Sequence, residues 1–499
     1  MMTVAELARR SGLLLDAGHR AAREPHLDCP VNRVACDSRR ITSGDLFVAV
    51  RGQRYDGAAF AEDAARRGAA AVVAEAPAPS GFGLPWITVP DARAALAALA
   101  AVAWDHPSRE LVVVGATGTN GKTTTTYLLE GVVEDAGYPC GRVSSISYRV
   151  ADDEESAGRT TPEAPDLQAL LRRMVERNCR ACVMEVSSHA LALRRVDGIS
   201  FNAAVFTNLT HDHLDFHGDM AGYFDAKRRL FGMVDAGSPA VVNVDDPHGR
   251  LLAAEVQRPV TYAIDAAADV RPARMELSAG GIELDLSTPR GALNLQSRLV
   301  GRSNTYNILA AAATGTALDL PQRAIQRGIA AVTHVPGRMQ VVSGSGDAVT
   351  AVVDFAHTSD ALRGLLDTAR SLTRGKLVTL FGCGGDRDRA KRPLMAAVAG
   401  RLSDFVIVTS DNPRSEDPVR IAADIVEGFE KGSAPHVTVL DRTAAIEQAI
   451  RDAADGDVVV IAGKGHERYQ EIGDRHVPFD DVAVARQALA GRRAGARTG

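Results

Sequence analysis

The sequence predicts an α/β protein built from several domains. With 499 residues, the chain is too long for one hydrophobic core, and typical domain sizes give about three domains. From Leu111 onward, strand-like runs alternate with helical patterns, which favours parallel sheets with helices on both faces. We therefore predict a small α/β domain at residues 1–107, a central α/β domain at 108–335 and a Rossmann-like α/β domain at 336–499.

The N-terminal domain carries short strands and alanine-rich helices. Helical patterns cover residues 58–67 and 92–104, and the second ends before Asp105-His106-Pro107-Ser108. Because proline disfavours a continuing helix, we place the first domain boundary there. The expected strands cover residues 45–50, 70–74 and 86–89.

The central domain combines the alternating pattern with one antiparallel segment. Residues 273–299 are typical of antiparallel strands joined by glycine turns. A break at Thr333–Gly337 ends this domain, and the alternation restarts beyond it. The expected strands cover residues 111–115, 181–186, 203–207 and 240–244, with a helix at 164–177, and then 349–354, 377–381, 405–409, 437–440 and 458–462 in the last domain.

The composition is that of an ordinary globular protein. The formal net charge of −5 argues against a general nucleic-acid binder, which carries a basic excess. No apolar run reaches the roughly 18 residues of a membrane-spanning helix, and Glu6, Arg9 and Arg10 interrupt the apolar N-terminus. The six cysteines are too few for a disulfide scaffold. We expect a cytoplasmic monomer with no nucleic-acid partner and no membrane insertion.

A glycine-rich turn follows the predicted strand at 111–115. It reads Gly118-Thr119-Asn120-Gly121-Lys122-Thr123-Thr124, and a predicted helix follows it. Glycines let backbone N–H groups converge on phosphate oxygens, the helix N-terminus adds its positive end, and Lys122 adds a formal charge. The Thr123 hydroxyl lies where a nucleotide-bound Mg²⁺ needs a ligand. The strict motif has glycine at the position of Ala116, and an ordinary glycine turn is the alternative interpretation. We predict a P-loop, which makes the central domain a mononucleotide-binding domain.

Two further polar segments follow predicted strands of the central domain. Glu185 stands at the carboxyl end of one strand, where open α/β sheets place ligands. A carboxylate at this position suits Mg²⁺. His211–His217 holds three histidines and two aspartates, which indicates metal or phosphate chemistry. A surface glutamate and a solvated polar loop are the alternative interpretations.

Charged loops follow four strands of the last domain. Asp354 ends one strand and is suited to accept a hydrogen bond from a ribose hydroxyl. Gly382–Arg387, Asp411–Arg414 and Gly463–Glu467 follow three others, so their charged side chains should meet at one edge of the sheet. Arginine is the side chain best suited to bidentate recognition of a carboxylate. One such loop is also compatible with a structural salt bridge, but four at one edge indicate a ligand site.

Together these segments resemble the Mur ligases, the ATP-dependent amino-acid-adding enzymes of peptidoglycan synthesis. The resemblance spans nearly the whole chain and includes Asp37-Ser38-Arg39 near the N-terminus. Phosphate loops of that family also lack the strict first glycine, which accounts for Ala116. Two departures, His211 for an expected arginine and Ser359 for an expected proline, fall at positions to which we assign no role.

The resemblance implies one group of residues for each ligand. Lys122, Glu185, His213 and Lys227 are expected to be catalytic. The expected Mg²⁺ ligands are Thr123, Glu185, His213 and Lys227, and the lysine becomes a ligand only as N6-carboxylysine, because carbamylation turns the ammonium into an anion. The remaining expected contacts are Gly118, Thr119, Asn120, Gly121, Lys122, Thr123, Thr124, Asn304, Asn307, Arg338 and Asp354 for ATP; Ser38, Thr160, Thr161, Ser188 and Arg195 for the UDP-N-acetylmuramoyl dipeptide; and Arg387, Asp411, Asn412, Pro413, Arg414, Gly463 and Glu467 for the incoming amino acid.

The resemblance also implies the reaction. ATP activates the carboxylate of UDP-N-acetylmuramoyl-L-alanyl-D-glutamate as an acyl phosphate, and the amine of meso-diaminopimelate displaces the phosphate. In this family the sequence Asp-Asn-Pro-Arg accompanies meso-diaminopimelate, whose second carboxylate the Arg414 guanidinium can bind. The alternatives are the same ligation with L-lysine or another diamino acid, a folylpolyglutamate synthase, and a P-loop ATPase or binding protein without ligase activity. Arg414 would repel the side-chain ammonium of lysine, and the long segment before the P-loop disfavours the folate enzyme.

Overall fold

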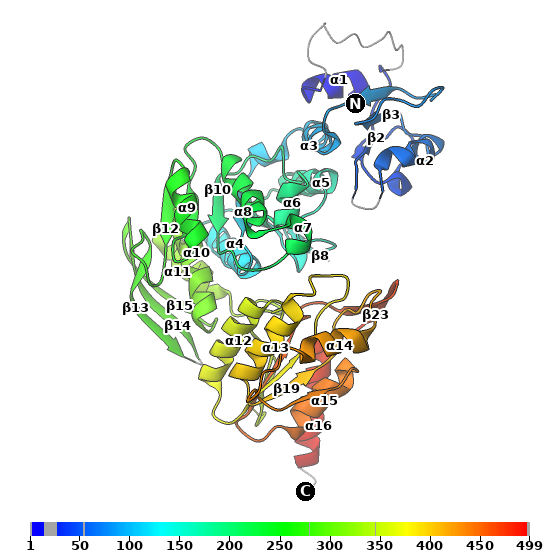
Figure 1. The fold of residues 1–499 in the computed structure, drawn as a ribbon. Coiled ribbons are helices and arrows are strands. Elements are labelled where there is room, and N and C mark those ends of the chain that lie inside the picture. Colours follow the sequence, from blue (N-terminus) through cyan, green and yellow to red (C-terminus); the bar gives the residue numbers. More distant parts are fainter. Residues whose placement is uncertain (1, 14–26, 53–54, 279, 345, 497–499) are drawn as a thin grey trace. The chain divides into compact units, whose positions relative to one another are not determined.

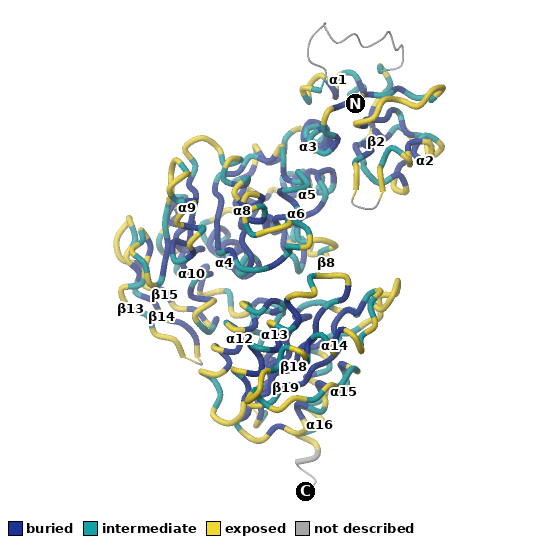
Figure 2. Tube along the Cα trace, viewed as in Figure 1, coloured by how far each residue is buried: buried dark blue, intermediate teal, exposed yellow. Residues whose placement is uncertain are grey.

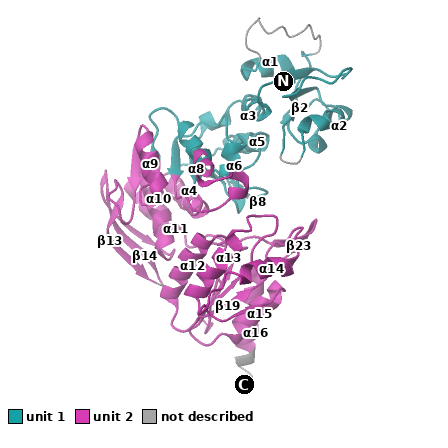
Figure 3. Cartoon of the chain, viewed as in Figure 1, with its two compact units in different colours: residues 1–117, 137–205, 226–240 teal, residues 118–136, 206–225, 241–499 magenta. Residues whose placement is uncertain are grey.

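The computed structural model describes residues 2–13, 27–52, 55–278, 280–344 and 346–496. The packing of the chain divides it into two units (Figure 3). The first unit comprises residues 1–117, 137–205 and 226–240, and the second comprises residues 118–136, 206–225 and 241–499. None of the helices in these described stretches has the length and hydropathy that a membrane crossing requires.

The first unit begins with a parallel sheet that has a core on each face. Its elements are α1 (Val4–Arg10), β1 (Val34–Ala35), β2 (Leu46–Ala49), α2 (Ala61–Arg66), β3 (Ala71–Ala74), β4 (Trp86–Thr88) and α3 (Ala92–Ala103). The strands lie in the order β1-β2-β3-β4. Successive side chains of a strand point to opposite faces, so Val73 packs under α3 while Val72 belongs to the core on the other face. The strands expected at 45–50, 70–74 and 86–89 are confirmed.

A second sheet follows in the same unit. Its elements are β5 (Val112–Thr117), β6 (Cys140–Val143), β7 (Ser147–Val150), β8 (Asp153–Ser156), α5 (Ala164–Glu176), β9 (Ala181–Glu185), α6 (Ser188–Ala192) and β10 (Ala203–Phe206). These strands lie in the order β10-β5-β9-β6-β7-β8. β6 runs parallel to β9, whereas β7 and β8 extend the sheet in antiparallel fashion. The parallel strands were predicted from the alternating pattern; the β6–β8 extension was not.

The second unit opens with the helix that follows the glycine-rich turn. Its elements up to residue 331 are α4 (Lys122–Asp135), α7 (Leu214–His217), α8 (Met220–Arg228), β11 (Ala240–Asn243), α9 (Pro247–Glu255), β12 (Pro259–Tyr262), β13 (Arg271–Ser278), β14 (Gly281–Thr288), β15 (Gly291–Ser297), α10 (Arg302–Ala317) and α11 (Gln322–Ala331), although the end of α8 belongs to the first unit. α4 packs against α10 and α11. β13, β14 and β15 form the expected antiparallel sheet.

The rest of the second unit is a sheet wound on both faces. Its elements are β16 (Gln340–Val341), β17 (Thr350–Asp354), α12 (Ser359–Leu372), β18 (Leu377–Phe381), α13 (Lys391–Leu402), β19 (Phe405–Val408), α14 (Pro418–Val426), β20 (His436–Thr438), α15 (Arg442–Asp452), β21 (Val458–Ala462), β22 (Tyr469–Ile472), β23 (Arg475–Pro478) and α16 (Asp481–Ala496). The strands lie in the order β16-β17-β21-β18-β19-β20, and all but β16 run parallel. Val352 packs in a core with α12, α13 and α14, and Val353 packs in a core with α15 and α16. Figures 1 and 2 show these buried strands between the helices.

This topology positions the charged loops. Because β17, β18, β19 and β21 are parallel neighbours, the segments that follow them leave the sheet at the same edge. The expectation that the four loops share one edge is therefore confirmed. A short hairpin, β22–β23, follows the last of these loops and was not predicted.

Candidate functional site

The phosphate loop, Gly118–Thr124, is shaped by two glycines in the left-handed half of backbone space. Gly118 has φ +150° and Gly121 has φ +89°. A Cβ atom on Gly118 would lie 1.8 Å from Thr207 Oγ1, and one on Gly121 would lie 2.4 Å from Asn307 Oδ1. Both positions therefore require glycine for conformation and for space.

A neighbouring segment holds the phosphate loop through its backbone. The Asn120 N–H donates to Asn208 Oδ1 (2.9 Å), and Asn208 Nδ2 donates to the Asn120 carbonyl (3.1 Å). Thr207 Oγ1 donates to the same carbonyl (2.6 Å), and the Thr119 N–H donates to the Asn208 carbonyl (2.9 Å). Asn208 thus satisfies both backbone polar groups of Asn120, a role that we did not predict from the sequence.

Cationic side chains gather at the phosphate loop. Lys122 Nζ donates to the carbonyls of Gly118 (2.9 Å) and Thr119 (2.8 Å), which holds the ammonium over the loop. An Arg338 guanidinium nitrogen donates to Thr123 Oγ1 (3.1 Å). α4 begins at Lys122, so its positive end points at the same place. The loop, the helix and two cations form a site suited to phosphate oxygens.

Two further groups of predicted residues lie near this loop. Asn307 and Asn304 come from the first turns of α10, and Asn307 Nδ2 donates to Asn304 Oδ1 (3.1 Å). Thr125 Oγ1 donates to Asn307 Oδ1 (3.4 Å), which connects α10 to α4. The Asp354 carboxylate accepts from the backbone N–H groups beside it, including that of Ala356 (2.7 Å). Burial raises the pKa of Asp354, and the nearby charge of Arg338 opposes that shift.

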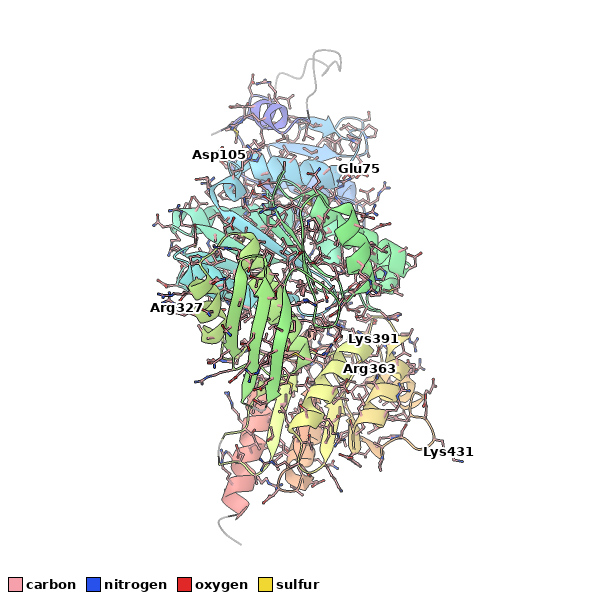
Figure 4. All side chains as sticks on the ribbon, turned by 90° about the vertical axis from the view of Figure 1, so that its left-hand side faces the viewer. Glu75, Asp105, Arg327, Arg363, Lys391 and Lys431 are labelled. Carbon is pink, nitrogen blue, oxygen red and sulfur yellow. The ribbon has the colours of Figure 1, made fainter. Side chains whose placement is uncertain are left out.

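Asp212, which is buried, lies between two imidazoles. Its Oδ2 is 3.4 Å from His213 Nε2 and 3.7 Å from His357 Nε2. Burial opposes ionisation of this carboxyl, but the neighbouring His357 and His213 imidazoles and the Lys391 ammonium lower the pKa of Asp212 below its usual range. Lys391, labelled in Figure 4, is itself buried at the start of α13. The segment identified by its histidines is thus a charged cluster rather than a solvated loop.

The residues that the family resemblance assigns to Mg²⁺ fall in both units. Thr123 and His213 belong to the second unit, whereas Glu185 and Lys227 belong to the first. Glu185 Oε1 accepts from the backbone N–H (2.7 Å) and the hydroxyl (2.8 Å) of Ser145. Within the described residues, no three His, Cys, Asp or Glu side chains are grouped to hold a metal. Oxygen donors of the kind present, a buried hydroxyl and a buried carboxylate, fit Mg²⁺.

The first unit contains a cavity of about 1220 Å³ beside the residues expected to hold the muramoyl peptide. Ser38 and Pro162 line it. The Arg195 guanidinium donates a hydrogen bond to the backbone carbonyl of Thr161, next to Pro162 (3.2 Å). It also forms an ion pair with Glu163 (2.9 Å). Thr160 is half-buried and Ser188 is buried. Six arginines and five acidic residues also line the cavity: Arg33, Arg39, Arg40, Arg93, Arg159 and Arg173, with Asp37, Asp63, Glu155, Glu163 and Asp166.

The loop Asp411–Arg414, called the 411–414 loop below, meets the loop after β21 through a buried lysine. Lys464 has no exposed surface, and its Nζ donates to Asn412 Oδ1 (2.9 Å) and Glu467 Oε2 (2.9 Å). Asn412 Nδ2 also donates to Glu467 Oε2 (2.8 Å). A Cβ atom on Gly463 would lie 2.6 Å from Asp411 Oδ2, so the two loops pack closely. Sequence analysis did not assign a role to Lys464.

Arg387 and Arg414 both border Gly384 at this edge of the sheet: a Cβ atom on Gly384 would lie 2.9 Å from Arg414 Nη1 and 3.8 Å from Arg387 Cγ. Partial burial and the positive charge of Arg414 lower the pKa of Arg387, while Glu471 and Asp215 oppose the shift. Arg414 donates to the Gly385 carbonyl (2.8 Å) and forms an ion pair with Glu471. Pro413 is buried in the same loop. Paired guanidiniums at a sheet edge are suited to an anionic ligand.

Three family descriptions match successive parts of the chain. They are the Mur ligase family catalytic domain at residues 30–104, the Mur ligase middle domain at residues 116–315 and the Mur ligase glutamate ligase domain at residues 337–465. A curated protein of Solibacter usitatus is 47% identical over 92% of this chain and 94% of its own length. The chain belongs to the Mur ligase family.

Two curated relatives and one solved structure that match this Mur ligase share a name. The Solibacter protein is called UDP-N-acetylmuramoyl-L-alanyl-D-glutamate–2,6-diaminopimelate ligase, and so is a protein of Geobacter metallireducens that is 46% identical over 92% of this chain and 95% of its own length. A solved structure with the same name matches with a TM-score of 0.68 and 32% identity over 99% of both chains. These matches confirm the three-domain α/β fold class; the boundaries at 107 and 335 stay a prediction.

Proposed function

We propose that this Mur ligase adds meso-diaminopimelate to UDP-N-acetylmuramoyl-L-alanyl-D-glutamate and converts ATP to ADP and phosphate. The observation that carries the proposal is that Arg387 and Arg414 both border Gly384 at the sheet edge, because meso-diaminopimelate has a second carboxylate and L-lysine does not. Relatives up to 47% identical are named as 2,6-diaminopimelate ligases, which agrees with this acceptor. Because ATP is a substrate, we place the reaction in the cytoplasm.

The nucleotide is assigned to the phosphate loop. Backbone N–H groups of this loop and the positive end of α4 bind the phosphates. Lys122 contacts the phosphoryl group that is transferred. We assign Asn304, Asn307, Arg338 and Asp354 to the same nucleotide, as the family resemblance implies. Arg338 already reaches Thr123 and so links the third domain to this loop.

Charge is the main obstacle to the first step, since a carboxylate must meet a triphosphate. The D-glutamyl carboxylate attacks the γ-phosphorus, the bond to the bridging oxygen breaks, and ADP leaves an acyl phosphate behind. Lys122 stabilises the charge on the transferring oxygens. Thr123, Glu185, His213 and carbamylated Lys227 would hold Mg²⁺, which supplies further charge neutralisation when bound. The UDP-N-acetylmuramoyl dipeptide is assigned to Ser38 and the arginine-lined cavity, and to Thr160, Thr161, Ser188 and Arg195.

The second step forms the amide. The free amine of meso-diaminopimelate attacks the acyl carbon, the C–O bond to phosphate breaks, and the ammonium proton is lost to solvent. Arg414 and Arg387 bind carboxylate oxygens, and Glu467 binds the ammonium of the same amino-acid head. Asp411, Asn412, Pro413 and Gly463 shape the loops that carry these groups.

The test offers purified protein ATP, Mg²⁺ and the UDP-linked dipeptide, with meso-diaminopimelate, L-lysine or L-ornithine as the acceptor. We expect ADP release that requires both substrates, and a kcat/KM for meso-diaminopimelate about 100-fold above that for L-lysine, since one hydrogen bond to a charged group contributes ~1.5–3 kcal/mol. Equal use of L-lysine would establish the lysine-adding alternative. ATP hydrolysis that ignores the dipeptide would establish the ATPase alternative.

A further inference from the structure

The hairpin β22–β23 runs along the whole 411–414 loop. Gln470 Nε2 donates to the Asp411 carbonyl (2.8 Å), and the Glu471 N–H donates to Asn412 Oδ1 (3.0 Å). The Arg414 N–H donates to the Glu471 carbonyl (3.0 Å), and the Gly473 N–H donates to the Arg414 carbonyl (2.9 Å). Four hydrogen bonds therefore fix the shape of a loop that has no regular structure of its own.

These contacts hold Arg414 in an unusual backbone conformation. Its φ is +53°, in the left-handed region that side chains other than glycine and asparagine rarely adopt. Both its N–H and its carbonyl bond to the hairpin, so the hairpin stabilises this conformation directly. The direction in which the Arg414 side chain leaves the loop is thus set by a segment more than fifty residues further along the chain.

The Glu471 side chain then fixes the guanidinium itself. Arg414 Nε pairs with Glu471 Oε2, and one terminal nitrogen of Arg414 donates to the Gly385 carbonyl (2.8 Å). Glu471 Oε1 lies 3.5 Å from His476 Nε2 on the other strand of the hairpin. Two partners on different segments leave the planar group little freedom to rotate, although the arginine side chain is long and flexible.

The negative charge of Glu471 also attracts the guanidinium of Arg387. Arg387 and Arg414 repel each other, and Glu471 is an acidic group that acts on both of them. A carboxylate ligand between two guanidiniums binds best when they are already held close together. A neutral residue at position 471 would remove the group that balances this repulsion and would let Arg414 turn toward solvent.

We infer that Glu471 is a positioning residue for amino-acid selection: by orienting Arg414 beside Arg387, it sets the preference for acceptors with a second carboxylate over acceptors with a side-chain ammonium alone. This inference rests on the proposed function and extends it to a residue that does not touch the acceptor. Glu471 acts through Arg414, which it contacts, and through its charge on Arg387. Its removal should therefore weaken recognition of the acceptor and leave the nucleotide and the muramoyl peptide unaffected.

The test variant is Glu471→Gln, which keeps the side-chain shape and the backbone bonds but removes the charge. We expect the KM for meso-diaminopimelate to rise about 10-fold, as for one lost contact between charged groups, with kcat and the KM values for ATP and dipeptide nearly unchanged. The preference for meso-diaminopimelate over L-lysine should fall by the same factor. Glu471→Asp, which keeps the charge on a shorter side chain, should retain part of the preference for meso-diaminopimelate over L-lysine.

The matched control is Glu430→Gln. Glu430 belongs to the same domain and lies 3.9 Å from Arg401, but its side chain is 66% exposed. It should leave all three KM values and the acceptor preference unchanged. Thermal melting of each variant reports whether the domain is still folded.

Three results would overturn the inference. One is an unchanged acceptor preference in Glu471→Gln, and another is a uniform loss of kcat with a lower melting temperature, which would show a structural role only. The third is a full loss of the preference for meso-diaminopimelate over L-lysine in both single variants, Glu471→Asp and the control Glu430→Gln. If the wild-type chain itself does not prefer meso-diaminopimelate, the proposed function fails as well, whereas a selective wild type with a selective Glu471→Gln variant overturns only the role of Glu471.

Discussion

The phosphate loop and the 411–414 loop are built by the same device with different chemistry. Each is an irregular segment held by hydrogen bonds from a segment distant in sequence, Thr207–Asn208 in one case and β22–β23 in the other. Thr207 and Asn208 are neutral, and they bind the backbone of the phosphate loop. The partners of the 411–414 loop include charges, and they fix side chains.

The difference corresponds to what each loop must recognise. In the proposed function, phosphate is bound mainly by backbone N–H groups, so the backbone shape of the loop has to be fixed, and Lys122 adds a charge. An amino acid is recognised by its charged groups, so the 411–414 loop needs guanidinium and carboxylate groups held in place. Holding charged groups in place requires burying some of them, which is unfavourable without partners. The fully buried Lys464 ammonium is stable only while Asn412 and Glu467 bind it.

The largest effect is expected at the centre of the phosphate loop. Lys122→Ala removes the cation that stabilises the transferring phosphoryl group, and loss of one such group costs about 10²–10³-fold in kcat. Substrate-dependent ADP release is the measurement. Lys431→Ala, at an exposed lysine labelled in Figure 4, is the control. Wild-type ligation by Lys122→Ala would refute the assignment of this loop.

A smaller and more selective effect is expected in the 411–414 loop. Arg414→Ala removes a charged partner of the second carboxylate, so the KM for meso-diaminopimelate should rise about 10–100-fold, as for a lost hydrogen bond to a charged group. The KM for ATP should stay the same, because the 411–414 loop and the phosphate loop are expected to bind different substrates. Steady-state kinetics with each substrate varied in turn measures both. Arg401→Ala, at an exposed arginine of the same domain, should change neither value. A parallel rise of both KM values would contradict independent loops.

Much of this arrangement can be predicted from the sequence because it depends on local patterns. The P-loop segment, the parallel strands and the shared edge of the charged loops follow from glycine spacing, apolar runs and the direction of parallel strands. The role of Lys227 could be inferred only from the family resemblance, since nothing near it in sequence marks it; the structure adds that this lysine is 1% exposed.

The partners of the two loops could not be predicted in the same way. Asn208 binds Asn120 across 88 residues, and Lys464 binds Asn412 across 52, so no local pattern connects them. The hairpin did have a signal: Gly473-Asp474 separates β22 from β23, and Gly473 has φ +57°, which is typical of a two-residue hairpin turn. What that signal could not indicate is the segment against which the hairpin packs.

The smallest effect tests the neutral support of the phosphate loop. Asn208→Ala removes two hydrogen bonds to the backbone of Asn120, but Thr207 still donates to the same carbonyl. With net values of ~0.5–1.5 kcal/mol per bond, we expect ADP to bind about 10-fold more weakly by calorimetry. The KM for meso-diaminopimelate should be unchanged.

The control for this change is Asn294→Ala, which removes an exposed asparagine that bonds to Asp285 on the antiparallel sheet and should not alter ADP binding. An Asn208→Ala variant that binds ADP normally would show that Thr207 alone is enough to hold the loop. A variant that instead loses meso-diaminopimelate binding would show that the two loops are coupled. In that case the phosphate loop would contribute to acceptor selection, and neutral backbone support could no longer be separated from charge-based recognition.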